Sequence, residues 1–130
     1  MALESSWTRE QAEQYLEQRA QRYAKMREDA ERVKQQLAES TATVTSPNGA
    51  VTVTVGSGGV MRSLRFGQRA EGLPLAQLSA SIMAAYGTAC RRAAEQSVEI
   101  VSELVGPDSP TLQLMRDAIP PDPDQQEGTR

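Results

Sequence analysis

The chain contains no histidine, a single cysteine and few aromatic residues. Without histidine it lacks the commonest general base and the commonest metal ligand. One cysteine, Cys90, leaves no internal disulfide and almost no basis for a transition-metal site. We therefore expect no cofactor and no metal, and we predict that the protein is not an enzyme.

Long apolar runs are also missing. No window approaches the roughly 18 apolar residues of a membrane-spanning helix. The start, MALESSWTREQ, has neither the basic nor the apolar region of a signal peptide. These absences predict a cytoplasmic protein without membrane contact. Because only 38% of the residues are hydrophobic and 4% aromatic, the core should be thin and completed by a second chain.

The net charge of −3 is unevenly distributed along the chain. Residues 107–130 hold five of the 17 acidic residues but only two of the 14 lysines and arginines, which leaves twelve of each sign in residues 1–106. The body is neutral and the end is acidic. Composition therefore gives no general affinity for DNA, and any basic surface must be local.

A first helix is predicted to begin at Thr8, because Thr8 and Gln11 have the spacing of a capping box. A heptad seam follows, with Arg19 in one apolar slot, through Ala12, Leu16, Tyr23, Met26, Ala30, Val33 and Leu37. Most charges alternate in sign, as on a solvated surface. One stretch without acids forms a basic band that suits phosphate or an acidic partner: Arg19, Arg22, Lys25 and Arg27.

Residues 40–66 predict a three-stranded antiparallel sheet. A two-residue turn at Asn48-Gly49 places Val44 opposite Val53 and Ala42 opposite Val55. A three-residue turn over 47–49 is the alternative, and it would put Val44 on the other face.

The second hairpin turns at residues 56–59. A turn symmetrical about Ser57-Gly58 pairs Val55 with Val60, Val51 with Leu64 and Val53 with Arg62. That register leaves Arg62 on the apolar face, where it either reaches past the sheet edge or serves a dimer or ligand contact. Arg65 is expected on the opposite, threonine-lined face.

A second helix is predicted from Pro74 until Gly106-Pro107 stops it. Its alanine-rich stretch 84–94 favours close approach of another helix or a dimer contact. In the doublet Arg91-Arg92, Arg92 is expected to pair with Glu95 or Gln96 on a wet surface; the alternative is that both arginines contact phosphate. Ser109-Pro110 predicts a short third helix.

The composition of residues 120–130 predicts a disordered acidic tail. This tail could solubilise the protein, shield a basic face or be a contact segment.

The predicted fold is α+β: a long helix, a three-stranded antiparallel sheet and a long helix (α-β-β-β-α) in residues 1–106, then a short helix and disordered tail in 107–130. This order, with GAVTVTVGSGG at residues 49–59 and Arg91-Arg92 after an alanine-rich stretch, resembles the YbaB/EbfC family of bacterial nucleoid-associated proteins over residues 10–105. The resemblance implies a homodimer at the nucleoid that contacts the DNA backbone with little sequence preference.

Candidate DNA contacts are Arg19, Arg22, Lys25, Arg27, Arg91 and Arg92. Candidate dimer-interface residues are Val51, Val53, Val55, Leu64, Ile82 and Tyr86. Proteins similar to this family also include accessory or chaperone-like components linked to type VII secretion. The alternative function is therefore an adaptor that binds a protein partner.

Overall fold

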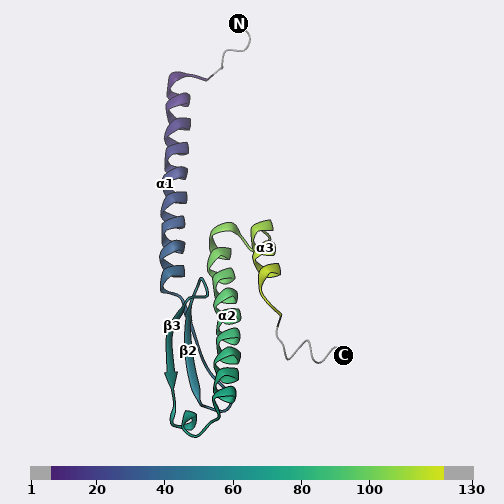
Figure 1. Ribbon diagram of the computed structural model, residues 1–130. Coiled ribbons are helices and arrows are strands. Elements are labelled where there is room, and N and C mark those ends of the chain that lie inside the picture. Colours follow the sequence, from purple (N-terminus) through teal and green to yellow (C-terminus); the bar gives the residue numbers. More distant parts are fainter. Residues whose placement is uncertain (1–6, 122–130) are drawn as a thin grey trace. The chain divides into compact units, whose positions relative to one another are not determined.

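The computed structural model describes residues 7–121, which divide into two compact units, one ending at Arg32 and one beginning at Val33. The element order is α1 (Arg9–Glu39), β1 (Thr41–Thr45), β2 (Val51–Gly56), β3 (Met61–Phe66), a 3-10 turn (Gln68–Ala70), α2 (Leu75–Val105) and α3 (Pro110–Ala118) (Figure 1). This order confirms the predicted α-β-β-β-α fold and the short third helix. The predicted disordered tail lies outside the described residues from residue 122 onward.

The start of α1 confirms the capping box. The Thr8 backbone N–H donates to Gln11 Oε1 at 2.9 Å, and the Gln11 N–H donates to Thr8 Oγ1 at 3.1 Å. Each side chain thus satisfies a backbone donor that the helix itself cannot. In the first unit the seam residues Leu16, Tyr23 and Met26 are 63%, 54% and 62% exposed.

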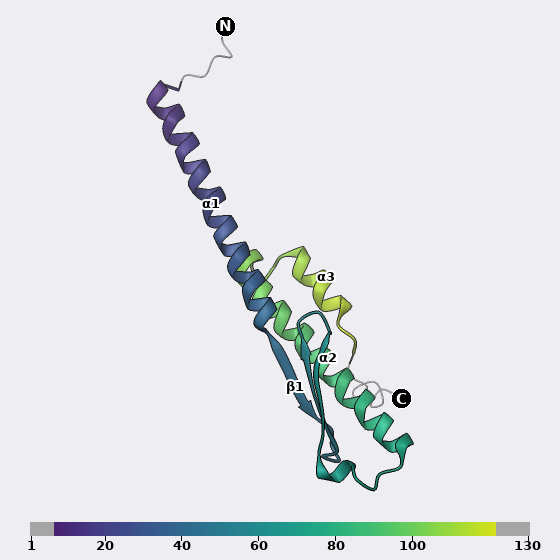
Figure 2. The ribbon, with the colours of Figure 1, turned by 60° about the vertical axis from the view of Figure 1, so that its left-hand side comes forward.

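The core of the second unit lies between α2 and one face of the sheet. The strands are antiparallel in the order β1-β2-β3, and α2 runs along β1 and β2 (Figures 1 and 2). The core residues are at most 2% exposed, and they are Val51, Val53, Val55, Ala85, Ala89 and Ala93. Alanines spaced by four residues present only methyl groups, so the backbone of α2 can approach the sheet closely. Ala85, Ala89 and Ala93 of this stretch pack on the strands of the same chain. A dimer contact over residues 84–94 stays a prediction.

The first hairpin has the register predicted from Asn48-Gly49. Val44 pairs with Val53 and Ala42 pairs with Val55. The hydrogen-bonded turn is centred on Pro47-Asn48, one residue before the predicted Asn48-Gly49, because the Gly49 N–H donates to the Ser46 carbonyl at 2.8 Å. Gly49 follows at φ 74°. The Asn48 side chain donates to Ser81 Oγ at 2.8 Å, which ties this turn to α2.

The predicted register of the second hairpin is wrong by two residues. Val53 pairs with Leu64 rather than with Arg62, and Val51 pairs with Phe66. One residue of the shift comes from the turn, because Gly56 pairs with Val60 through a 2.9 Å hydrogen bond. The other comes from a bulge beside Val55. Each shift of one residue moves the following side chains to the other face of the sheet. The two shifts together restore the original face, so Leu64 stays on the apolar face.

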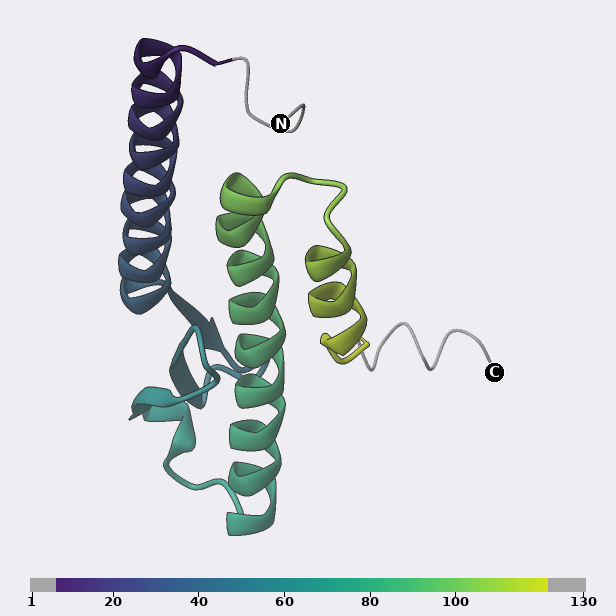
Figure 3. The same ribbon diagram turned by 90° about the horizontal axis from the view of Figure 1, so that it is seen from above.

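The ends of α2 and α3 follow local signals. α2 stops at Val105, before Gly106 at φ 86°, as expected. α3 begins with Pro110 after the N-cap Ser109, whose side chain accepts from the Thr111 N–H. α3 packs beside α2, with Leu112 fully buried (Figure 3). No helix within residues 7–121 is long and apolar enough to cross a membrane.

Candidate nucleic-acid interface

Four of the predicted DNA contacts lie on α1, in the first unit. Among the residues that the structure describes, no carboxylate lies within 4 Å of the charged groups of Arg19, Arg22, Lys25 or Arg27, although two other arginines of α1 are paired. Arg9 lies 3.5 Å from Glu13, and Arg32 lies 3.2 Å from Asp29. The α1 stretch without acids therefore carries cations that do not already neutralise a carboxylate.

Arg19 is held in place by its own helix. Its guanidinium donates to the Tyr23 hydroxyl at 3.2 Å and to the Tyr15 hydroxyl at 3.5 Å. It also lies 5.6 Å from the centroid of the Tyr23 ring. These hydrogen bonds, the one to Tyr23 first, raise the pKa of Arg19 above its ordinary value. In its seam slot, Arg19 is thus held between two tyrosines, one turn before it and one turn after it.

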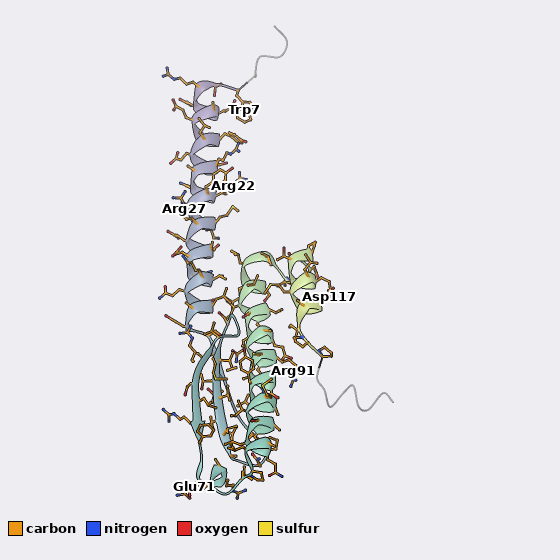
Figure 4. All side chains as sticks on the ribbon, viewed as in Figure 1. Trp7, Arg22, Arg27, Glu71, Arg91 and Asp117 are labelled. Atoms are coloured by element: carbon orange, nitrogen blue, oxygen red, sulfur yellow. The ribbon has the colours of Figure 1, made fainter. Side chains whose placement is uncertain are left out.

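The α1 cations do not form one stripe. Arg22 and Lys25 are three residues apart, which places them about 60° apart around the helix. Arg27 is five residues beyond Arg22, about 140° around the helix. Figure 4 shows Arg22 and Arg27 on different sides of α1. One DNA backbone can therefore meet Arg22 and Lys25 together, but not Arg27 with them.

The open face of the sheet is a second cationic surface. It faces away from α2 and carries Arg65 beside a row of hydroxyl groups, which we call the hydroxyl face: Thr41, Thr43, Thr45, Thr52, Thr54 and Ser63. Cross-strand pairs hold the hydroxyls, with 2.9 Å between Oγ1 of Thr43 and Thr54 and between Oγ1 of Thr45 and Thr52.

Arg62 also belongs to the hydroxyl face, not to the apolar face where the predicted register placed it. It is the extra residue of the bulge, and its Nε lies 2.9 Å from the position of a Cβ built on Gly56. Gly56 is paired with Thr41, so that position points toward the hydroxyls. The absence of a side chain at Gly56 leaves the space that the Arg62 guanidinium occupies.

A sequence signal for this surface exists and was missed. Residues 41–70 contain three arginines, Arg62, Arg65 and Arg69, and no aspartate or glutamate. The net charge of residues 1–106 does not reveal this stretch, because an excess of acidic residues elsewhere in that range offsets its three arginines. Counting charge by structural element would have found it.

Arg91 and Arg92 lie on α2, in the second unit. Arg91 projects from the side of α2 turned away from the sheet (Figure 4). Its side chain is 18% exposed, and its Nε lies 3.9 Å from Glu95, so Arg91 rather than Arg92 is the partner of Glu95. Both arginines line a groove of about 590 Å³ that also includes Pro120 and Pro121.

The predicted dimer-interface residues fall into two groups. Val51, Val53 and Val55 are at most 1% exposed and already covered by α2 of the same chain, so they offer no surface to a second chain. The other three, Leu64, Ile82 and Tyr86, are only partly covered. The Tyr86 hydroxyl donates to the Gly59 carbonyl at 2.7 Å, which ties α2 to the second hairpin turn.

The apolar face of the sheet continues beyond α2 onto β3. Leu64 and Phe66 share this face with the buried valines, yet they are 37% and 56% exposed. Beside them lies a hollow of about 350 Å³ with Phe66, Ala70 and Leu78 in its wall. This uncovered strand is a surface that another apolar element can cover.

Comparison with known proteins gives one family. Residues 12–108 match the YbaB/EbfC DNA-binding family. The matched range begins in α1 and ends just after α2, so it contains both cationic helix segments and the whole sheet. A search of curated proteins finds no match.

Proposed function

The chain belongs to the YbaB/EbfC DNA-binding family, and we propose that it is a nucleoid-associated protein that binds DNA as a homodimer. It contacts the phosphate backbone with little sequence preference, in the cytoplasm at the nucleoid. Family membership is the observation that carries this proposal. The cations without carboxylate neighbours on α1 and the arginines of the hydroxyl face support it.

Backbone contact is favoured by how the cations are displayed. Lysine and arginine side chains that meet phosphates bind every sequence alike, whereas sequence is read by groups aligned on base edges. On α1 the cations spread around the helix instead of forming a single edge. On the hydroxyl face, threonine and serine hydroxyls beside Arg62 and Arg65 are the groups that commonly donate to phosphate oxygens.

Homodimerisation is supported by uncovered apolar surface in both units. Leu16, Tyr23 and Met26 of α1 repeat with the spacing of a coiled-coil seam and are exposed. Leu64 and Phe66 extend the core of the sheet beyond α2. A second copy provides apolar surface for each patch, because a two-fold interface uses the same surface patch of both chains.

The test is a salt-dependent DNA titration combined with light scattering. Duplexes of unrelated sequence should bind at about 10 µM dimer or below in low salt, with similar affinities and a steep loss as salt rises. Light scattering should give twice the chain mass. A dimer that shifts no duplex at low salt would overturn DNA binding, and a large affinity difference between duplexes would overturn backbone-only recognition.

The alternative adaptor function has one supporting observation, the exposed apolar seam on α1. A seam that is not used for dimerisation is a surface for another protein's helix. Substituting Leu16 and Met26 by glutamine distinguishes the two functions. Loss of the dimer would show that the seam serves self-association. An intact dimer would favour the seam as a binding surface for another protein.

A further inference from the structure

The second unit contains a groove beside Arg91 and Arg92. It is bounded by the outer side of α2, by the end of β1 with the turn that follows, and by the two residues where the described chain ends, Pro120 and Pro121. Met83 contributes apolar surface and is 68% exposed. The only charged groups among the described lining residues are the two guanidinium groups, so the groove favours an anionic occupant.

The chain itself supplies such an occupant. Pro120 and Pro121 already line the groove, and the nine residues that follow are Asp122 to Arg130. Consecutive Cα atoms are about 3.8 Å apart, so any segment that continues from Pro121 starts within reach of the groove. This segment has three acidic residues within six positions, at 122, 124 and 127. Nine residues reach at most about 30 Å, which is enough to remain beside both arginines.

The composition of this segment suits an extended bound form. Prolines at 120, 121 and 123 restrict the backbone to extended conformations, which lowers the entropy lost on binding. In an extended polyproline chain, residues two apart are separated by about 6 Å. Asp122 and Asp124 can therefore present two carboxylates to two neighbouring guanidinium groups, and such pairs form strong charge-assisted hydrogen bonds.

We propose that residues 122–130 bind in this groove of their own chain, with the Asp122 and Asp124 carboxylates on Arg91 and Arg92. The bound segment competes with DNA phosphate for these arginines and weakens DNA binding at low salt. Segment binding stands by itself, whereas the competition rests on the proposed function. The acidic segment would then be an internal substitute for the phosphate backbone.

Cys90 provides a direct readout, because the only cysteine of the chain lines the same groove. The test compares the wild type with Asp122→Asn/Asp124→Asn/Glu127→Gln, in which the tail carries no acidic side chain. The control is Glu99→Gln/Glu103→Gln/Asp108→Asn, which removes the same charge from exposed positions outside the groove. Cys90 alkylation by iodoacetamide is measured at constant pH, in low salt and in about 0.5 M salt, where the Debye length falls to about 4 Å.

In low salt the variant without tail acids should be alkylated about three- to tenfold faster than the wild type, the range that two partly exposed ion pairs allow. The control variant should react like the wild type. High salt should bring the wild type toward the variant without tail acids. Equal rates in low salt would overturn the proposal. Protection that increases with protein concentration would overturn binding within the same chain.

DNA titrations of the same proteins test the competition. The variant without tail acids should bind about three- to tenfold tighter than the control variant in low salt. Adding Arg91→Gln/Arg92→Gln should remove that gain. Faster alkylation with unchanged DNA affinity would overturn the competition and leave segment binding in place. If no variant binds DNA, the proposed function fails, and the alkylation rates alone decide whether the segment binds.

Discussion

Arg22 and Lys25 give the sharpest test of DNA contact. They lie about 60° apart on α1, and no carboxylate in the described chain is within 4 Å of either charged group. Arg22→Gln/Lys25→Gln removes both charges but keeps long polar side chains on an exposed helix surface. The fold should be unaffected, because both residues are exposed.

The expected size follows from counterion release. Each phosphate contact contributes about 0.9 to the slope of log K against log salt. If the two side chains of one α1 helix each meet a phosphate, their removal lowers the slope by about 1.8, and if both chains of a dimer do so, by about 3.6. We assume that the wild type and the variant have equal affinities when extrapolated to about 1 M salt. At about 0.1 M salt, which is one unit of log salt lower, log K of the variant is then lower by about 1.8 or about 3.6. The measured change therefore also reports how many α1 helices contact the DNA.

Fluorescence anisotropy with a labelled duplex, measured over a series of salt concentrations, gives the slope. The matched control is Arg9→Gln/Arg32→Gln, which removes the same charge from the same helix at residues that already face Glu13 and Asp29. We expect the control to change the slope by less than about half as much. Equal slopes for the two variants would refute direct contact by Arg22 and Lys25, because only overall charge would then matter.

Three further predictions concern the sheet and the core. Leu112→Ala should lower the free energy of unfolding by about 2–5 kcal/mol, measured by urea denaturation, because the fully buried leucine leaves a cavity. Gly67→Ala should cost about 1–3 kcal/mol in the same assay, since its Cβ would lie 2.9 Å from the Gly49 carbonyl oxygen, whereas Gly58→Ala meets nothing within 4 Å and should be neutral. Leu64→Asp/Phe66→Asp should raise the dimer dissociation constant at least about tenfold by sedimentation, and an unchanged dimer would exclude β3 from the interface. Leu114→Asp, at a 72%-exposed position on α3, is its control.

The helix ends were predictable because their signals are local. The Thr8 and Gln11 side chains satisfy each other's backbone donors within one turn, and Gly106-Pro107 and Ser109-Pro110 likewise act within a few residues. The first hairpin register was also predictable from Asn48-Gly49, although the hydrogen-bonded turn is centred one residue earlier, on Pro47-Asn48. None of these features depends on a distant part of the chain.

The second hairpin shows where local signals stop. Gly56 to Gly59 allow several turns, and the sequence does not mark the bulge beside Val55. The shift at the turn, which pairs Val55 with Met61, moved Arg62 from the apolar face to the hydroxyl face, and the bulge returned Leu64 to the apolar face. This single shift changed Arg62 from a candidate interface residue into part of a cationic surface.

The candidate site was only partly predictable. The acid-free stretch of α1 was visible in the sequence. Its cations point to different sides of the helix because successive residues are rotated by about 100° around the helix axis. The pairing of Arg91 with Glu95 and the groove that contains Arg91 and Arg92 depend on side-chain packing. The six predicted interface residues looked equivalent in the sequence, and only packing separated the three valines covered by α2 from the rest.

By itself, the sequence determined the order of elements, the ends of the helices, the apolar parity of the sheet and the resemblance to a DNA-binding family. These properties follow from periodicity and capping, which act over one turn or one strand. The tertiary structure alone decided which apolar residues are already covered. It also decided that the described chain ends in a groove beside two arginines. Burial depends on residues far apart in the sequence, so it is settled only when α2 packs on the sheet and α3 packs on α2.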